Sequence, residues 1–316
     1  MNRQVDLLKK LLFEDQKVLV ATISPDNPPT MSVKPGETVL VETYYRVGVP
    51  EGRQFIAPPY PNPLMGPIEV QGAEPSDTIA VKVHNIAPST GHGFTASSLW
   101  WWFGSWKLAD RTRDLLDKAL SIPTSTSQGY PCVIKEGKVY VGDKFVVPYR
   151  PMIGTIGTAP LIESISAYHP GIHGGNMDLP EVTVGNTIFL PVFVKGALLH
   201  LGDVHAVQGE GEINGTGVEM CSQVEITIDL VKHKTIAYPH IESPDRLMSV
   251  CSTGYGKTLG DAIRIAFTDL VLWMEEDYGF DRWDAYTLCG QVGELRLGNI
   301  WTVAAKIPKK YLKKTA

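Results

Sequence analysis

The chain lacks most of the features that mark membrane, nucleic-acid-binding and disulfide-rich proteins. Its 316 residues include only four cysteines, with no CxxC pair, which argues against a cysteine-rich zinc site and a disulfide framework. A formal net charge of −5 leaves no basic excess to neutralise phosphates. No apolar run reaches the roughly 20 residues that span a bilayer. We therefore expect a cytoplasmic protein with reduced thiols that binds neither nucleic acid nor membrane.

Several common catalytic motifs are also missing. The chain contains no GxSxG elbow, no Ser-x-x-Lys pair and no glycine-rich P-loop. His200 and His205 lie five residues apart, so on one strand they would face opposite sides, unlike the HxH pair of a cupin iron site. The first residues, MNRQVDLLKKLLFEDQ, do not combine an apolar core with a small-residue cleavage site, and we expect no signal peptide.

The hydrophobic pattern predicts a mainly β protein with helices at its N- and C-terminal ends. Residues 5–14 place leucines at helical spacing, which predicts a short amphipathic helix. Gln223 to Leu230 alternates apolar and polar residues, as in a sheet with one face in water. Residues 258–280 predict the longest helix, with Thr258 and Asp261 as a capping pair.

We expect three parts in the chain. Residues 1–150 form an N-terminal β-rich domain with an irregular, tryptophan-rich section, and residues 151–250 form a β-rich domain that carries the polar motifs. Residues 251–316 form a C-terminal α/β portion that packs on the rest. The tryptophans between Trp100 and Trp106 are more typical of a core or subunit contact than of a substrate lid, and both interpretations stay open.

The most distinctive feature is a pair of polar, glycine-rich runs, HPGIHGGNMD at 169–178 and LGDVHAVQGEGE at 201–212. Potential ligands at this density are costly to bury unless they are paired or bound to metal. Asp203 and His205 are two residues apart, so on a strand they share a face. Asp178 would complete a set suited to zinc or a similar divalent ion with one open position for water.

A metal-bound water would need a general base, and Glu212 or Glu210 could accept its proton. Each residue also has a structural interpretation. Asp178 could shape a turn, a single buried histidine is more often hydrogen-bonded than a ligand, and Glu210 and Glu212 could belong to an exposed turn around Gly211. Calcium held as a structural ion is a further alternative.

One family resemblance covers nearly the whole chain. The string GGNMD, followed by LPVFVKGALLHLGDVHAVQGEGEINGTGVE, resembles the acetamidase/formamidase family. The segments GPIEVQGAEPSDTIAVKV, PMIGTIGTAP and PHIESPD resemble other segments of that family. The chain departs from the pattern at Glu210, where aspartate is commoner, and at Gln71, where glutamate is commoner. The longer side chain at position 210 leaves the substrate range open.

The resemblance implies hydrolysis of short aliphatic amides, formamide or acetamide, to the carboxylic acid and ammonia. It also implies a β-rich fold with jelly-roll-like sheets and a smaller α/β portion, assembled as a homodimer or higher homo-oligomer. Carried over residue by residue, it marks as functional Asn176, Asp178, Asp203, His205, Gln208, Glu212 and Glu219.

Our hypothesis is a metal-assisted amidohydrolase with three groups of site residues. The metal ligands are Asp178, Asp203 and His205; the catalytic candidates are Glu212, Glu210 and Glu219; the substrate-binding candidates are Asn176, Gln208 and His173. Three alternatives stay open. They are a non-catalytic β-sandwich module that binds metal or a small ligand, a family member adapted to another C–N bond, and a metal-free site with a lysine or cysteine nucleophile.

Overall fold

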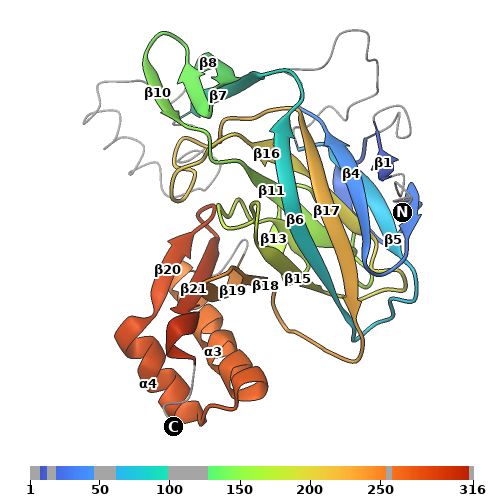
Figure 1. Ribbon diagram of the computed structural model, residues 1–316, viewed down its shortest axis with the longest axis vertical. Helices are drawn as coiled ribbons and strands as arrows, with labels where there is room; N and C mark the ends of the chain where they lie inside the picture. The colour runs from blue at the N-terminus through green and yellow to red at the C-terminus, as the bar shows by residue number, and fades with distance from the viewer. Residues whose placement is uncertain (1–7, 13–18, 46–61, 99–126, 254–257, 313–316) are drawn as a thin grey trace, which may run out of the picture.

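The computed structural model describes residues 8–12, 19–45, 62–98, 127–253 and 258–312. This part of the chain consists mainly of strands, together with two α-helices and one short 3₁₀ helix. Figure 1 shows the strands stacked in the larger part of the molecule and the two helices gathered at one end. The prediction of a mainly β protein is confirmed.

The largest sheet in the described part of the chain has nine strands. In spatial order its strands are β1 (Lys9–Leu11), β4 (Glu37–Thr43), β17 (Ser222–Val231), β6 (Thr78–Pro88), β15 (Thr187–Pro191), β18 (His240–Glu242), β19 (Arg246–Ser252), β21 (Thr302–Pro308) and β20 (Glu294–Leu297). The predicted alternation is present in β17, where Val224, Ile226 and Ile228 are buried and the residues between them are partly exposed. One face of this sheet therefore supplies the main core.

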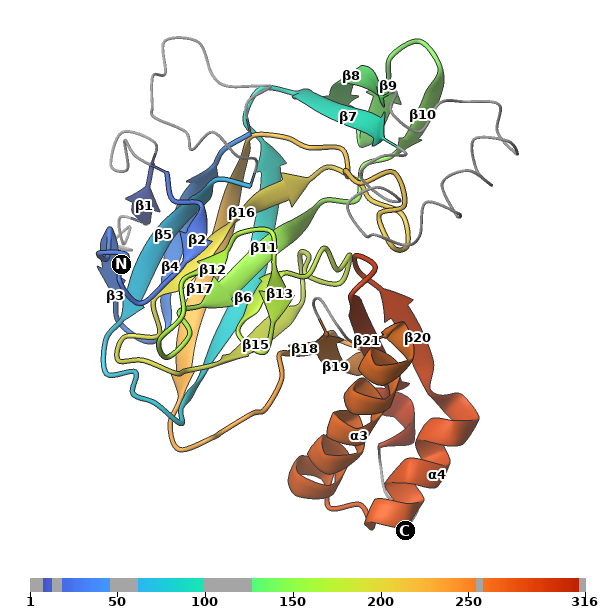
Figure 2. The same cartoon turned by 180° about the vertical axis from the view of Figure 1, so that it is seen from behind.

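A second sheet of six strands packs on that face. Its strands are β13 (Pro170–Gly171), β14 (Gly174–Asn176), β11 (Met152–Thr158), β16 (Leu199–His205), β5 (Leu64–Val70) and β3 (Met31–Val33). Apolar side chains of both sheets form one buried cluster, in which Ile153 and Leu201 join Val81 and Val224. In both ribbon views β11 and β16 form a layer beside β6 and β17 (Figures 1 and 2). All residues of β11 and β16 are buried.

Two smaller sheets complete the β structure. The four-stranded sheet consists of β10 (Phe145–Pro148), β9 (Lys138–Val141), β8 (Ser127–Lys135) and β7 (His92–Ser98), and β12 (Ile165–Ser166) pairs with β2 (Thr22–Ile23). Figure 2 shows the four-stranded sheet at the end of the molecule opposite the helices. The loops that follow β14 and β16 lie between these two ends (Figures 1 and 2).

The C-terminal helices cover the far part of the nine-stranded sheet. Helix α3 (Leu259–Tyr278) is capped by Thr258, whose side chain accepts from the Asp261 N–H while the Asp261 carboxylate accepts from the Thr258 N–H, and Asp281 caps α4 (Arg282–Val292). Their apolar faces pack on β19 and β21 in a separate core, and η1 (Lys309–Tyr311) follows. Within the described ranges, neither helix is long and apolar enough to cross a membrane.

The predicted N-terminal helix is wrong over the residues that the structure describes. Lys9–Leu11 is an edge strand that pairs in parallel with Val39 to Val41 of β4, and Leu11 is buried in the main core. Pairing with an existing strand outweighs the local helical spacing of the leucines. The Trp100–Trp106 cluster lies outside the described residues. The jelly-roll detail and the three-part division stay predictions.

Candidate active site

The polar motifs meet where β14 and β16 end beside β11. Asn176 ends β14 and Asp178 follows two residues later, while Asp203 and His205 lie at the end of β16. An isolated bridge pairs His205 with Glu219, which adds a second acid from the following segment. Asp178, Asp203, His205 and Glu219 are all buried, whereas Glu212 keeps part of its surface exposed.

Three of the acidic residues have an uncommon backbone conformation. Asp178, Asp203 and Glu212 have φ angles of 47°, 56° and 49°, in the left-handed region. A non-glycine residue there costs on the order of 1–3 kcal/mol and persists only where the surrounding structure enforces it. Such residues concentrate at functional sites, and here they turn three carboxylates toward one imidazole.

One glycine makes the close approach of two aspartates possible. A Cβ atom on Gly154 of β11 would lie 2.6 Å from the Asp203 carbonyl oxygen, 2.7 Å from Asp178 Oδ1 and 2.9 Å from Asp203 Oδ2. Those distances are shorter than any normal contact, so a side chain here would force the carboxylates apart. Gly154 belongs to the segment PMIGTIGTAP, but sequence reasoning did not single it out.

The arrangement of ligand atoms fits a divalent cation. Asp178, Asp203 and His205 each offer an atom within 4.8 Å of the others, and so do His205, Glu212 and Glu219. His205 Nε2 lies 3.4 Å from Asp203 Oδ1 and 3.2 Å from Glu219 Oε2. Asp178 Oδ1, His205 Nε2 and Glu219 Oε2 are nevertheless buried without a hydrogen-bond partner in the described structure. Buried polar atoms are rarely left unpaired, and a shared cation would satisfy all three.

The electrostatics of the cluster point the same way. Burial, followed by the charge of Asp203, raises the pKa of Asp178 to about 7. Burial and the Asp178 charge raise the pKa of Glu212 well above its usual value, and burial also raises the pKa of Glu219. Burial disfavours the charged imidazole, yet Glu219 and Asp203 raise the pKa of His205 well above its usual value. The cluster therefore holds more negative charge than one imidazolium neutralises, which a divalent cation would offset.

Gln208 determines which nitrogen His205 presents to the acids. Its Nε2 donates to the Asp178 backbone carbonyl at 2.6 Å, which can only accept. The Gln208 Oε1 therefore faces His205 Nδ1, at 2.8 Å, and the Nδ1–H donates to it. His205 Nε2 is thus the atom turned toward Asp203 and Glu219. A histidine ligand held in this way has its tautomer and ring orientation fixed by its neighbour.

Asn176 is held so that its amide nitrogen is available. Asn62 Nδ2 donates to Asp203 Oδ2 at 2.8 Å and to Asn176 Oδ1 at 3.0 Å, and Thr155 Oγ1 lies 2.5 Å from the same Asn176 oxygen. The amide oxygen of Asn176 therefore accepts, and its Nδ2 has no partner within the described ranges. Asn299 secures the backbone by donating to the Asn176 carbonyl at 2.5 Å and to Asp178 Oδ2 at 3.2 Å.

Two of the predicted site residues lie apart from this cluster. The Glu210 carboxylate, in a half-exposed side chain, accepts from the Leu297 backbone N–H at 2.8 Å and from Arg296. His173 is buried and belongs to neither set of potential ligands, and burial lowers its pKa to about 4. Sequence reasoning in turn missed Asn62, Gly154, Thr155 and Asn299, of which only the two in PMIGTIGTAP carried a recognisable signal.

Fold and site together define a β-sheet protein with a buried carboxylate and imidazole centre suited to a cation. Residues 162–303 match the model of the Acetamidase/Formamidase family. A solved acetamidase from Yersinia enterocolitica is 34% identical with a TM-score of 0.84, and the match covers 99% of this chain and 95% of that one. The chain belongs to the acetamidase/formamidase family.

Two curated relatives extend the comparison. An acetamidase of Mycolicibacterium smegmatis is 29% identical over 262 residues, which cover 66% of this chain and 64% of the relative. A formamidase of Methylophilus methylotrophus is 26% identical over 255 residues, which cover 66% of this chain and 63% of the relative. The matched stretch of this chain therefore spans less than two thirds of either protein's length.

Proposed function

We propose that this protein hydrolyses short aliphatic amides, such as formamide and acetamide, to the carboxylic acid and ammonia. The observation that carries the proposal is the buried His205 with carboxylates around its Nε2 edge and three unpartnered ligand atoms at the centre. Similarity to proteins named acetamidase and formamidase supports the choice of substrate.

Asp178, Asp203 and His205 would hold the divalent ion. An imidazole among the ligands favours zinc over calcium, which takes oxygen ligands only. When bound, the ion would supply Lewis-acid activation of the amide carbonyl and of a water molecule. Uncatalysed amide hydrolysis is slow enough that the site must lower its barrier by well over ~8 kcal/mol.

Glu212 accepts the proton of the attacking water and passes it to the departing nitrogen. It suits this role better than Glu219 because Glu212 is partly exposed, whereas Glu219 is buried against His205. Asn176 donates its free Nδ2 hydrogen to the amide carbonyl oxygen, where negative charge develops. Thr155 and Asn62 maintain the orientation of that amide group.

Three other predicted residues have supporting roles in this proposal. Gln208 orients His205 instead of touching the substrate, because both ends of its amide are already bonded. Glu210 positions the loop that carries Glu212 by binding Arg296 and the Leu297 N–H of β20. Glu219, whose Oε2 lies 3.2 Å from His205 Nε2, would help to hold the ion that His205 binds.

A cytoplasmic location and assembly into a homodimer or higher homo-oligomer belong to the same proposal. All four cysteines are free and buried, which agrees with a reducing compartment.

The direct test is ammonia release from a panel that includes formamide, acetamide, a carbamate and a urea derivative. Chelator-stripped protein should lose turnover of the two small amides, and added zinc should restore it. Asp203→Asn should behave like stripped protein, while Asp143→Asn, at an exposed aspartate of the β9–β10 turn, should behave like wild type. Full activity without metal would refute the metal assignment. Cation-dependent melting without any turnover would identify a non-catalytic binding module.

A further inference from the structure

A cavity of about 770 Å³ lies directly beside the candidate active site. Its walls come from the four-stranded sheet and the following Arg150, from the segments that follow Asp178 and His205, and from Arg296 of β20. None of the potential metal ligands lines it. Three of its lining residues contact residues of the site: Gln208 bonds His205 through its amide, Gly217 packs against the His205 ring, and Arg296 pairs with Glu210. The cavity therefore borders the Nδ1 edge of the imidazole, while the carboxylates face its Nε2 edge.

The wall of this cavity is mainly apolar. Its apolar side chains include Tyr130, Val141, Phe145, Val147 and Val207. Phe145 is 55% exposed although it is a large aromatic residue on an edge strand. A volume of this size and an apolar lining with a few polar groups are typical of small-molecule sites.

The charge of the lining is one-sided. Among the described lining residues are two arginines and no carboxylate. Arg296 is already paired with Glu181 and Glu210. Arg150 is exposed, and its guanidinium has no carboxylate within ion-pair distance in the part of the chain that the structure describes. Its backbone N–H is anchored to the Ala206 carbonyl, next to His205.

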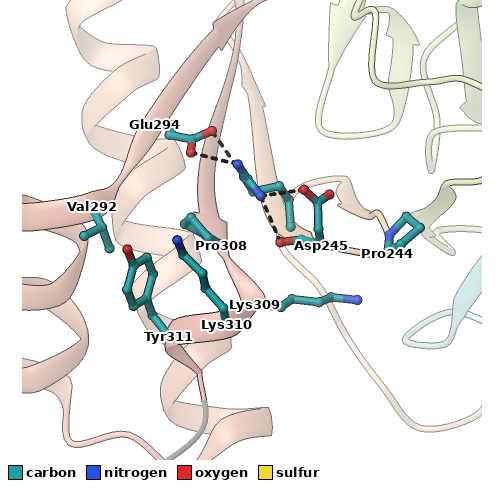
Figure 3. A pocket seen from close by; sticks show the side chains of 9 residues that line it. Pro244, Asp245, Val292, Glu294, Pro308, Lys309, Lys310 and Tyr311 are labelled. Carbon is teal, nitrogen blue, oxygen red and sulfur yellow. Dashed lines mark hydrogen bonds and ion pairs between the residues drawn. The ribbon is translucent and has the colours of Figure 1, made fainter.

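A second hollow in the C-terminal portion makes a useful contrast. It is also lined by basic residues, but Arg246 is paired with Asp245 and Glu294 (Figure 3). Lys309 is paired with Glu242. Carboxylates of the protein therefore neutralise most of the positive charge of that hollow, whereas Arg150 in the larger cavity remains available to a ligand.

We propose that this cavity binds an amphipathic monocarboxylate, with its apolar body against Phe145 and Val147 and its carboxylate on Arg150. A guanidinium forms two parallel hydrogen bonds with a carboxylate, and the apolar wall selects against small, fully hydrated anions. The site is separate from the cation cluster and does not depend on the proposed reaction.

Calorimetric titration of the 316-residue protein with sodium hexanoate tests this site, because hexanoate contains no amide bond to hydrolyse. Arg150→Gln should weaken hexanoate binding by about tenfold or more, as expected for a lost charged hydrogen bond. Lys138→Gln removes one positive charge from the same sheet outside the cavity and should have no effect. Phe145→Ser should also weaken binding, and its exposed position keeps the fold intact.

Three ligand controls complete the experiment. Hexylamine and hexanamide should bind more weakly than hexanoate, and acetate or inorganic phosphate should bind more weakly still. The proposal is overturned if hexanoate does not bind, if Arg150→Gln binds it as tightly as wild type, or if phosphate matches hexanoate. Since no turnover is measured, these outcomes leave the test of amide hydrolysis untouched.

Discussion

Gln208 Oε1 lies 2.8 Å from Nδ1 of His205, and this contact sets the direction in which the buried imidazole presents its other nitrogen. The Gln208 amide cannot exchange the positions of its oxygen and nitrogen, because the nitrogen donates to the Asp178 backbone carbonyl. Gln208, which was predicted to bind the substrate, therefore orients His205, a potential metal ligand.

Gln208→Ala should reduce both zinc affinity and kcat/KM for formamide by about 10- to 100-fold, the usual cost of removing a hydrogen bond that orients a metal ligand. Dialysis against buffered zinc and an ammonia assay measure the two effects. Gln71→Ala is the matched control, since Gln71 is exposed and its side chain bonds only Ser32 among the described residues. Unchanged zinc affinity in Gln208→Ala would mean that the imidazole is held without it.

Gly154→Ala should destabilise the protein by about 1–3 kcal/mol, because the added methyl group meets Asp178 and Asp203 at less than 3 Å. It should also lower zinc affinity by displacing two ligands. Urea unfolding measures the stability change. Gly290→Ala, in an open position on α4, should instead stabilise by up to about 1 kcal/mol. Wild-type stability and zinc binding in Gly154→Ala would refute the close-approach argument.

His200 should make the protein lose stability in acid. Burial lowers its pKa to about 4, and its two ring nitrogens are occupied by the Leu198 carbonyl and the Asn27 amide. A histidine with a lowered folded-state pKa stabilises the protein above its ordinary pKa of 6.5, and this contribution is lost as the pH falls toward 4. The loss per group is at most about 1.4 kcal/mol for each pH unit.

Urea unfolding at several pH values between 7 and 4 measures this effect. His200→Gln should show a shallower decline than wild type, although it starts from a lower stability. His84→Gln replaces an exposed histidine and should keep the wild-type slope. Parallel slopes for wild type and His200→Gln would show that His200 does not carry the acid sensitivity.

Thr258→Ala should destabilise the protein by about 1 kcal/mol, since it removes the side chain that accepts from the Asp261 N–H in the capping box of α3. Thr268→Ala, in the middle of the same helix, should be neutral or slightly stabilising because alanine is the better helix former. Thermal unfolding of both variants gives the comparison. If Thr258→Ala melted at the same temperature as wild type, the Thr258 cap would not stabilise α3.

Local sequence patterns were sufficient to predict an element where its structure depends mainly on its own residues. The alternation in β17 and the Thr258–Asp261 pair of α3 both predicted what is found, because each depends on neighbours in the chain. The strand Lys9–Leu11 was not predictable in this way, since its conformation depends on pairing with β4. Edge pairing of this kind leaves no periodic signal in so short a segment.

The residues of the candidate active site also fall into those that the sequence could predict and those that it could not. Asp203 and His205 could be grouped because they are two residues apart on one strand, and Asp178 followed from the neighbouring motif. Asn62 and Asn299 could not be predicted from local patterns. Asn62 is 141 residues away from Asp203, which it bonds, and Asn299 is 121 residues away from Asp178. Glu210 and Glu212 look equivalent in sequence, but in the structure Glu210 is exposed and bonds Arg296, whereas Glu212 is partly buried and belongs to a set of potential ligands.

The most direct test of the proposed reaction compares Glu212→Gln with Glu210→Gln in one assay of ammonia release from saturating formamide. Both proteins are loaded with zinc and their bound zinc is quantified, so that a lost general base is distinguished from a lost ion. The account predicts that Glu212→Gln retains zinc and loses at least about 100-fold in kcat, while Glu210→Gln stays within a few-fold of wild type. Wild-type turnover by zinc-loaded Glu212→Gln would contradict it.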